Sequence, residues 1–463
     1  MVFSSLSFLF FFLPCTALLY YICPARRWRN GVLLAASLLF YSWGEPRYVP
    51  VMLAAALVAW LGGLCMERGG RLRKPAFLLT VTLLLGNLFF FKYLGFAAEN
   101  LGLLLGRELS APAVVLPLGI SFYTFQILSY VIDLYRGEVR VQRNFASLLL
   151  YVSFFPQLIA GPIVRYQSIE NALQDRRESL ERFCRGLERF VLGLGKKVLL
   201  ANSAARLAET IYAGDPAVYG AGALWLAALA YTLQIYFDFS GYSDMAIGLG
   251  RIFGFDFPEN FNYPYTALSI TDFWRRWHIS LSTWFRDYVY IPLGGNRVSR
   301  PRWILNLMIV WGLTGLWHGA SWNFVLWGLY YGLLLAAEKL FLGRLLEKLP
   351  KLLRWALCFW VVMLGWVLFN LTDFSVLSDV LRRMFLLSPT DWAAMLADDL
   401  SLVKGVLVLP LGLACAMPLT RRLRRAEGLG PELLRMAGCL VILLLSLTML
   451  FSTRYNPFIY FRF

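Results

Sequence analysis

Long apolar runs recur along almost the whole of this 463-residue chain, and they limit its possible folds more than any other feature. They lie near residues 3–22, 31–43, 48–66, 77–95, 114–135, 187–212, 221–238, 303–320, 322–342, 355–371, 403–419 and 433–452. About 20 apolar residues in a helix cross the hydrocarbon core of a bilayer. Hydrophobic residues make up 59% of the chain and charged ones 16%, too apolar a mixture for soluble domains. The sequence therefore predicts an all-α polytopic membrane protein with about 11–12 transmembrane helices.

The basic residues lie in short clusters between the apolar runs. The clusters fall near residues 26–29, 68–74, 136–143, 176–197, 297–302, 344–354 and 421–425. Cytoplasmic loops of membrane proteins carry such an excess of Lys and Arg, so these clusters predict a zigzag that begins with the N-terminus outside. The first run, 3–22, has no positive charge before it, which favours a retained span over a signal peptide. Because the net charge of +16 follows this pattern, we expect contact with membrane lipids and no nucleic-acid partner.

Two regions do not have the pattern of simple spans. Residues 145–163 contain Pro156, Gly161 and Pro162, which break a helix in the middle of an apolar run. Residues 238–302 are aromatic, charged and rich in Gly and Pro, and they predict short amphipathic helices and loops on the cytoplasmic face. No internal repeat or linker marks a second domain, so the sequence predicts a single membrane domain over 1–463.

The chain contains only two histidines, His278 and His318, and each lies beside tryptophans. Histidine is the usual proton carrier in catalysis because its ordinary pKa is near neutrality. His318 lies near the end of the run 303–320, where an ionisable side chain marks a site or a structural bond to a neighbouring helix. The position of His318 in the sequence does not by itself favour either interpretation. The seven cysteines are scattered without a C-x-x-C pair, so we expect no metal site.

Two arginines and two tryptophans immediately precede His278. Arg275 and Arg276 form a pair that can hold a phosphate bidentately. The alternative is that the pair, together with Trp274 and Trp277, anchors an interfacial helix at the lipid headgroups. For the tryptophans the anchoring role is favoured.

Other polar residues precede this segment. Asp238 and Asp244 follow an apolar run, and we expect them to cap helices or to pair with the two arginines rather than to bind a metal. Asn260 and Asn262 are expected to form a turn before Pro264.

Several motifs together resemble the membrane-bound O-acyltransferase (MBOAT) family. They are MVFSS at 1–5, PLGISFY at 117–123, YFDFSGYSDMAIG at 236–248, ENFNYPY at 259–265, DFWRRWHISLS at 272–282, LGGNR at 293–297 and WHG at 317–319. The likeness spans nearly the whole chain and is densest over 117–332. It is strongest to a bacterial branch that contains membrane proteins of alginate and peptidoglycan O-acetylation.

The resemblance implies a helical fold with a central tunnel, in the bacterial cytoplasmic (inner) membrane. It implies that His318 is the general base that takes the acceptor's hydroxyl proton, and that His278 belongs to the same site. The expected donor substrate is acetyl-CoA or another acyl thioester, with no bound cofactor. The donor-binding candidates are Arg275, Arg276, Trp274 and Asn260. The implied product is an O-acetylated extracytoplasmic polysaccharide, such as alginate or peptidoglycan.

The C-terminal segment NPFIYFRF, residues 456–463, is expected outside the cell. It either anchors the last helix through its aromatic residues or acts in the reaction. It resembles an aromatic tail of this branch in which a tyrosine carries the acyl group, and Tyr460 is the residue that matches. The external segment 372–402 is too small for a catalytic domain. The resemblance therefore implies an extracytoplasmic partner of the serine-esterase (SGNH-like) type that completes transfer to the sugar.

Two other functions remain as alternatives. One is a transporter or flippase of acylated envelope precursors, which would favour inverted repeats with paired broken helices, whereas only 145–163 is broken. The other is D-alanyl transfer to teichoic acid. In that system the tail motif belongs to a separate small partner, and a tail built into the chain favours acetylation.

Overall fold

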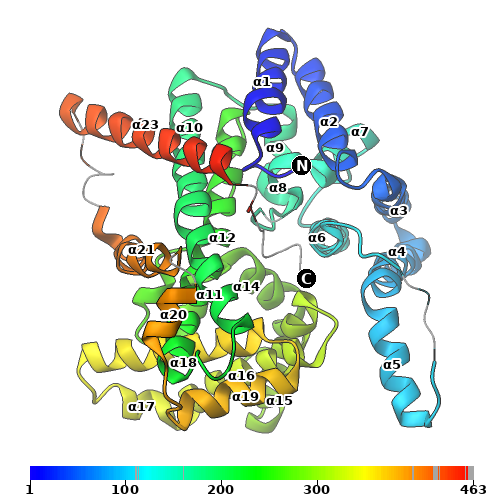
Figure 1. The fold of residues 1–463 in the computed structure, drawn as a ribbon. Helices are drawn as coiled ribbons and strands as arrows, with labels where there is room; N and C mark the ends of the chain where they lie inside the picture. Colours follow the sequence, from blue (N-terminus) through cyan, green and yellow to red (C-terminus); the bar gives the residue numbers. More distant parts are fainter. Residues whose placement is uncertain are drawn as a thin grey trace. The chain divides into compact units, whose positions relative to one another are not determined.

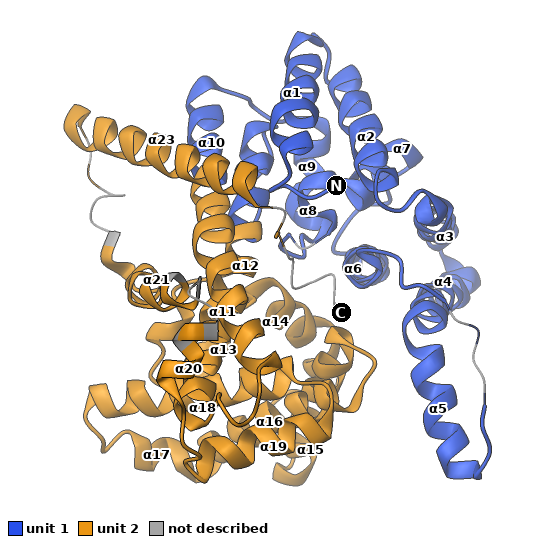
Figure 2. Cartoon of the chain, viewed as in Figure 1, with its two compact units in different colours: residues 1–190, 243–258 blue, residues 191–242, 259–463 orange. Residues whose placement is uncertain are grey.

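The computed structural model describes residues 1–109, 112, 114–159, 161–398, 401–420, 426, 428–453 and 455–456. Every regular element in these ranges is a helix, which confirms the predicted all-α class (Figure 1). Two compact units are present (Figure 2): residues 1–190 with 243–258, and residues 191–242 with 259–463. The single domain over 1–463 stays a prediction.

The first unit is built around the buried helix α6. Its helices are η1 (Phe8–Phe12), α1 (Leu13–Ile22), α2 (Arg26–Ser42), η2 (Pro46–Tyr48), α3 (Val49–Glu67), η3 (Gly70–Leu72), α4 (Arg73–Leu88), η4 (Phe89–Tyr93), α5 (Leu94–Leu105), α6 (Ile120–Arg136), α7 (Phe145–Ser153), α8 (Phe155–Leu158), α9 (Tyr166–Gln174) and the first part of α10 (Leu180–Gly195). Every residue of α6 from Ile120 to Val131 is buried. The predicted break in 145–163 is confirmed, because α7 ends at Ser153 and α8 contains Pro156 in its first turn.

A buried arginine joins several segments of the first unit. The Arg176 guanidinium donates to the Tyr20 hydroxyl at 3.0 Å and to the Asn30 amide oxygen at 2.7 Å. Glu178 accepts hydrogen bonds from Arg26 and Tyr20. Burial raises the pKa of Glu178, but the hydrogen bonds from Arg26 and Tyr20 outweigh burial and lower it to about 2. The single carboxylate of Glu178 is thus paired with the guanidinium groups of Arg26 and Arg176 within the protein, which favours its charged form.

The second unit carries both histidines. Its helices are η5 (Lys196–Ala201), α11 (Asn202–Ala213), most of α12 (Ala221–Ile252), η6 (Pro264–Thr266), α13 (Ile270–Arg276), α14 (Ile279–Phe285), η7 (Arg286–Tyr290), α15 (Arg300–His318), α16 (Trp322–Ala337), η8 (Glu338–Leu342), α17 (Gly343–Leu346), α18 (Lys351–Asn370), α19 (Phe374–Phe385), α20 (Trp392–Asp398), α21 (Ser401–Cys415), η9 (Pro418–Thr420) and α23 (Leu429–Ser452). Short helices and loops fill 259–299, as the sequence predicts, but 238–252 is different.

Helix α12 continues without interruption to Ile252, whereas the sequence predicts loops and short helices after residue 238. The glycines of this segment serve helix packing instead of ending the helix. A Cβ atom on Gly241 would lie 2.7 Å from the carbonyl oxygen of Gly193, and one on Gly248 would lie 2.5 Å from that of Gly186. Both contacts are with α10, so only glycine permits this close approach of the two helices.

The two acids of α12 have partners other than those expected. Asp238 lies 2.8 Å from the Lys197 ammonium group, and both side chains are 3% exposed. Asp244 lies 2.6 Å from the Arg189 guanidinium. The prediction that they cap helices or pair with the arginines before His278 is wrong, because α12 continues past them and directs them toward cations of α10 and η5.

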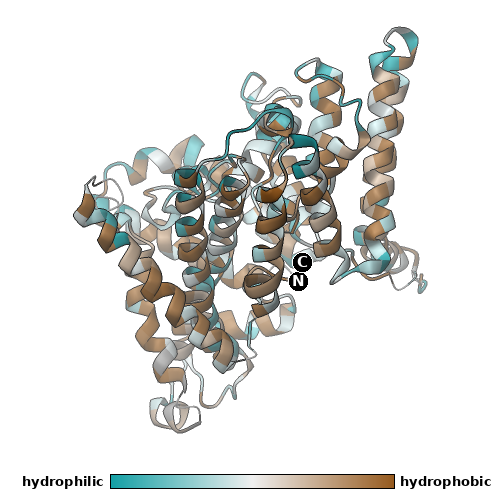
Figure 3. Ribbon diagram, turned by 90° about the horizontal axis from the view of Figure 1, so that it is seen from above, coloured by the Kyte–Doolittle hydropathy of each residue, from teal (hydrophilic) through white to brown (hydrophobic). Residues whose placement is uncertain are grey.

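Five helices of the described chain are long and apolar enough to cross a membrane. They cover Pro46–Glu67, Gly70–Leu105, Trp322–Leu346, Lys351–Asn370 and Leu429–Ser452. The other predicted spans are helical too, but they are shorter or carry more buried polar residues, as in α6 and α12. Hydrophobic residues cover most of the helices, while hydrophilic ones gather at helix ends and loops (Figure 3). Buried polar groups on central helices indicate function rather than contact with lipid.

Candidate active site

His318 is the last residue of α15 and lies in an aromatic cage. Its side chain is 6% exposed. The imidazole centroid lies 5.0 Å from the Trp317 ring, 5.1 Å from the Trp327 ring and 5.2 Å from the Phe369 ring. The cage excludes bulk water and lowers the local dielectric, which strengthens any hydrogen bond that the imidazole makes to a substrate.

His278 lies at the junction of α13 and α14 with a left-handed backbone, at φ 45°. Such a conformation is uncommon for a residue other than glycine and concentrates at functional sites. The side chain is 1% exposed, and its ring contacts Phe239 at 4.6 Å and Trp317 at 5.8 Å. Burial lowers the pKa of His278 well below its usual range, and His318 lowers it further. The structure thus brings the two histidines together around Trp317, with His278 neutral.

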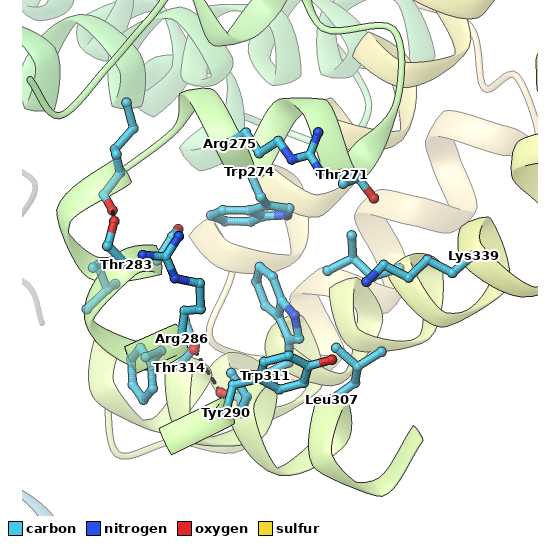
Figure 4. Close-up of a pocket in the computed structure, with 16 residues that line it drawn as sticks. Thr271, Trp274, Arg275, Thr283, Arg286, Tyr290, Leu307, Trp311, Thr314 and Lys339 are labelled. Carbon is cyan, nitrogen blue, oxygen red and sulfur yellow. Dashed lines mark hydrogen bonds between the residues drawn. The ribbon is translucent and has the colours of Figure 1, made fainter. Parts of the chain in front are cut away.

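A cavity of about 430 Å³ lies between α13, α14, α15 and η8 (Figure 4), and neither histidine is among its lining residues. Its lining residues are Thr271, Trp274, Arg275, Ile279, Leu281, Ser282, Thr283, Phe285, Arg286, Tyr290, Leu307, Val310, Trp311, Thr314, Leu335 and Lys339. Indole rings and aliphatic side chains form its walls. Three cations (Arg275, Arg286 and Lys339) line it as well, and all three are exposed. This combination suits a ligand with an anionic end and an apolar stem.

The three cations differ in how far the protein neutralises them. Arg286 binds the carboxylate of Asp287 at 2.6 Å. Lys339 lies 5.6 Å above the Trp303 ring, and Arg275 makes no ion pair or hydrogen bond with any described residue. In Figure 4, Arg275 comes from α13 and Lys339 reaches toward the cavity from the facing helix. Two positive charges are therefore available to an anionic ligand.

The neighbouring arginine, Arg276, points to a different environment. Its guanidinium binds Asp272 on the same helix at 2.9 Å, and it is not part of the cavity lining. The backbone and threonine oxygens near its other nitrogens belong to the 262–266 segment. The sequence suggests that the two arginines act as one pair, whereas the helix separates them by about 100°. Arg276 binds Asp272, and Arg275 lines the cavity.

A carboxylate forms hydrogen bonds between two walls of the cavity. Glu338, the first residue of the π-helix η8, accepts hydrogen bonds from the backbone N–H groups of Ile270 at 2.7 Å and Thr271 at 3.2 Å. The N–H groups in the first turn of a helix have no partner within the helix, and Glu338 supplies one for these two. The Ser269 side chain accepts from the Asp272 N–H in the same turn. Helix α13, which carries Arg275, is thereby fixed against the helix that carries Lys339.

The helix that ends at His318, α15, also forms part of the cavity wall. Thr314 in its lining precedes His318 by four residues, or about 6 Å along the helix axis. The Trp274 ring in the cavity wall contacts the Trp327 ring at 5.6 Å, and Trp327 contacts His318. Two successive indole rings, Trp274 and Trp327, therefore connect the cavity wall to the histidine.

The C-terminal segment is anchored just before the tail residue singled out in the sequence. Tyr460 lies outside the described residues. The Tyr455 hydroxyl donates to Glu209, and the Arg206 guanidinium lies 5.2 Å above the Tyr455 ring. The Asn202 amide donates to Asn456 at 3.4 Å. Tyr455 and Asn456 therefore both contact α11.

The predicted donor-binding residues do not form one group. Trp274 and Arg275 line the cavity, while Arg276 binds Asp272 and Asn260 binds His278. Sequence analysis missed Arg286, Lys339 and the capping Glu338. Arg286 follows the WHISLS motif by four residues, a spacing that places it on the cavity side of the same helical segment. Lys339 lies inside the apolar run 322–342, and a cation within an apolar run was the signal that could have identified it.

Comparison with known proteins gives a broad match. Residues 138–377 match the sequence profile of the membrane-bound O-acyltransferase family, MBOAT. The probable alginate O-acetylase AlgI of Azotobacter vinelandii is 44% identical over 400 residues, 85% of this chain and 79% of that protein. The peptidoglycan O-acetyltransferase of Helicobacter pylori is 34% identical over 425 residues, 83% of this chain and 80% of that protein. The teichoic acid D-alanyltransferase of Bacillus subtilis is 31% identical over 251 residues, 51% of this chain and 61% of that protein.

Proposed function

Because the chain belongs to the membrane-bound O-acyltransferase family, we propose that it transfers an acetyl group through the membrane for O-acetylation of an extracytoplasmic polysaccharide. Alginate and peptidoglycan are the polymers named for its relatives. The observation that carries the proposal is the cavity with cations in its lining. Its wall residue Trp274 contacts Trp327, and Trp327 contacts His318.

The proposed donor is acetyl-CoA, which enters from the cytoplasm. Arg275 and Lys339 bind its phosphates, since both lack a carboxylate partner in the described structure and an arginine can bind a phosphate bidentately. The apolar wall formed by Trp274 and Trp311 takes the pantetheine arm. The donor's acetyl end then points along α15 toward His318. This orientation puts the cationic mouth on the cytoplasmic side, in accord with the N-terminus outside and a location in the bacterial cytoplasmic membrane.

The chemistry at His318 is general base catalysis. The imidazole takes the proton of an acceptor hydroxyl as the hydroxyl oxygen attacks the thioester carbonyl. The carbon–sulfur bond breaks, the acetyl group becomes an ester, and the leaving thiolate takes the proton back from the imidazolium. His318 ends the cycle neutral, and no cofactor is required. His278 supplies a second neutral imidazole in the same water-poor site.

The proposed first acceptor is the Tyr460 hydroxyl. The anchored segment supports this relay, because Asn456 is held on α11 in the unit that contains both histidines. An extracytoplasmic partner of the serine-esterase type then takes the acetyl group from Tyr460 to the sugar hydroxyl.

A labelling experiment tests this function. The purified protein in nanodiscs is incubated with radiolabelled acetyl-CoA, as wild type and as His318→Ala, His278→Ala and Tyr460→Phe. We expect label on the wild type, loss of labelling and of thioester cleavage in His318→Ala, and loss of labelling in Tyr460→Phe. Label that persists in Tyr460→Phe contradicts the relay. Equal thioester cleavage in wild type and His318→Ala contradicts the catalytic role of His318.

A further inference from the structure

Three donors converge on the side-chain oxygen of Asn260, a residue that is 1% exposed. The backbone N–H of Ser280 lies 3.2 Å from Asn260 Oδ1, and the Ser280 hydroxyl lies 2.9 Å from it. The third group is Nδ1 of His278, at 3.1 Å. Asn260 therefore touches the histidine rather than the donor cavity.

This arrangement decides which nitrogen of His278 carries the proton. A backbone N–H can only donate, so the atom of Asn260 that faces Ser280 is the amide oxygen and not the nitrogen. An amide oxygen only accepts, and His278 Nδ1 must therefore be protonated to bond it. Burial keeps the imidazole neutral, which leaves Nε2 without a proton.

The backbone around His278 is built to hold this geometry. The Ile279 N–H donates to the carbonyl oxygen of Asn260 at 3.0 Å, and the Asn262 N–H donates to that of Arg276 at 2.9 Å. The segment 260–262 thus runs beside the 276–279 turn and pairs with it on both sides of His278. These bonds hold the left-handed backbone of His278, which is costly by itself. The ENFNYPY motif thereby acquires a physical role in this site.

We propose that Asn260 is a positioning residue that holds His278 as the Nδ1–H tautomer and presents its bare Nε2 to the substrate. Nε2 is buried and has no hydrogen-bond partner among the described residues. In this state His278 accepts a hydrogen bond or a proton but cannot donate one through Nε2. The tautomer is inferred from the hydrogen bonds alone. Its consequence for catalysis rests on the proposed acyl transfer.

Few charged or titratable groups surround His278. Asn260 and Ser280 are uncharged, and Phe239 and Trp317 cover the ring. The titratable group that acts on the His278 ring is His318 on α15, and the neighbouring acid of Phe239 on α12, Asp238, is bound to Lys197. No carboxylate contacts the His278 ring in the described structure, so its protonation state responds mainly to a charge introduced at Asn260.

The chain's two histidines make the tautomer directly measurable. The protein is labelled with ¹⁵N-histidine, purified on a tag without histidines and reconstituted in lipid, and its imidazole nitrogens are recorded by solid-state NMR. A His318→Gln variant assigns the remaining signal to His278. We expect protonated Nδ1 and bare Nε2 at neutral pH in the wild type, and appearance of the Nε2–H form in Asn260→Ala. A wild-type His278 in the Nε2–H form, or an unchanged spectrum in Asn260→Ala, overturns the proposal.

Activity measurements separate positioning from a merely structural role. We expect Asn260→Ala to lower kcat for thioester cleavage by about 10–100-fold, less than the roughly 100–10,000-fold that a general acid or base itself contributes, while KM for acetyl-CoA changes less than about twofold. Asn260→Asp keeps the acceptor oxygen and adds a negative charge, so it restores the tautomer and raises the pKa of His278. Its kcat–pH profile should lose activity on the acid side at higher pH than the wild type. An Asn260→Asp profile that matches Asn260→Ala at every pH contradicts the positioning role.

A matched control lies two residues away. Asn262→Ala is the same change in the same segment, and both bonds of Asn262 use its backbone. We expect it to keep the wild-type tautomer, kcat and KM. Thermal unfolding of each variant identifies any loss of the fold. If His278→Ala retains full activity, the role of His278 in the proposed function fails, but the NMR result on Asn260 still stands or falls on its own.

Discussion

Arg275 and Arg276 are adjacent in the sequence, yet the structure predicts opposite consequences for the same substitution. Arg275 lines the cavity and has no partner among the described residues. Arg276 is bound to Asp272, and the two side chains are 32% and 33% exposed. We predict that Arg275→Gln weakens donor binding and that Arg276→Gln does not.

The magnitude follows from the contacts that each arginine makes. A hydrogen bond to a charged group contributes about 1.5–3 kcal/mol, and the exposed mouth of the cavity favours the lower end. Loss of about 1.4 kcal/mol is a tenfold change in affinity, so Arg275→Gln should raise KM for acetyl-CoA about tenfold. An exposed pair four residues apart on a helix contributes only about 0.3–0.5 kcal/mol to stability, which is the expected cost of Arg276→Gln.

The assay is cleavage of acetyl-CoA by the purified protein, with KM and kcat measured at low and at physiological salt. The Arg275→Gln effect should shrink as salt increases, because mobile ions screen exposed charges over about 8 Å. Dephospho-CoA thioesters locate the phosphate that is bound. If Arg276→Gln raises KM as much as Arg275→Gln, or if neither changes it, the assignment of the cavity to the donor phosphates is refuted.

Further predictions concern the parts that support the site and the fold. Glu338→Ala removes the cap of α13, so it should cost about 1 kcal/mol of stability and raise KM for the donor, measured by thermal unfolding and kinetics. Lys197→Met removes the ammonium group that lies 2.8 Å from the buried Asp238 carboxylate and should destabilise the protein by about 3–5 kcal/mol, whereas Lys197→Met combined with Asp238→Leu recovers most of that loss in the same unfolding assay. The Glu178 pKa of about 2 lies below its ordinary 4.5, so its ion pairs stabilise the fold fully above pH 4.5 and lose this effect as pH falls toward 2. Glu178→Gln should therefore be less stable than wild type at pH 7, and the difference should vanish near pH 2. Tyr455→Phe removes the bond to Glu209 and should make the C-terminal segment more accessible to limited proteolysis, with α23 unaffected.

Much of the architecture is predictable because it depends on local composition. The helical class and the break at Pro156 follow from apolar runs and from a residue that cannot donate a backbone hydrogen bond. The extent of α12 does not follow, because Gly241 and Gly248 are helix breakers by propensity and close-packing residues in this fold. Only the facing glycines of α10 reveal the difference, and no local pattern contains that information.

The candidate site divides in the same way. Its two histidines stand out in the sequence because the chain has no others, and their place in recognisable motifs assigns them to one enzyme family. The partners of polar residues were harder to predict. Asp238, Asp244 and Arg276 all bind groups other than those expected, because a partner depends on helix rotation and on packing between distant segments.

By itself, the sequence determined that the bilayer is this protein's environment, that its fold is helical, and that its two histidines are the candidates for its chemistry. These properties are set by composition and by residues that are rare in the chain. The tertiary structure alone decided that Arg275 and not Arg276 lines the cavity, that Glu338 joins its walls, and that Asn260 fixes the proton on His278. Each of these depends on the direction of a single side chain, and that direction is set only when segments far apart in the chain pack together.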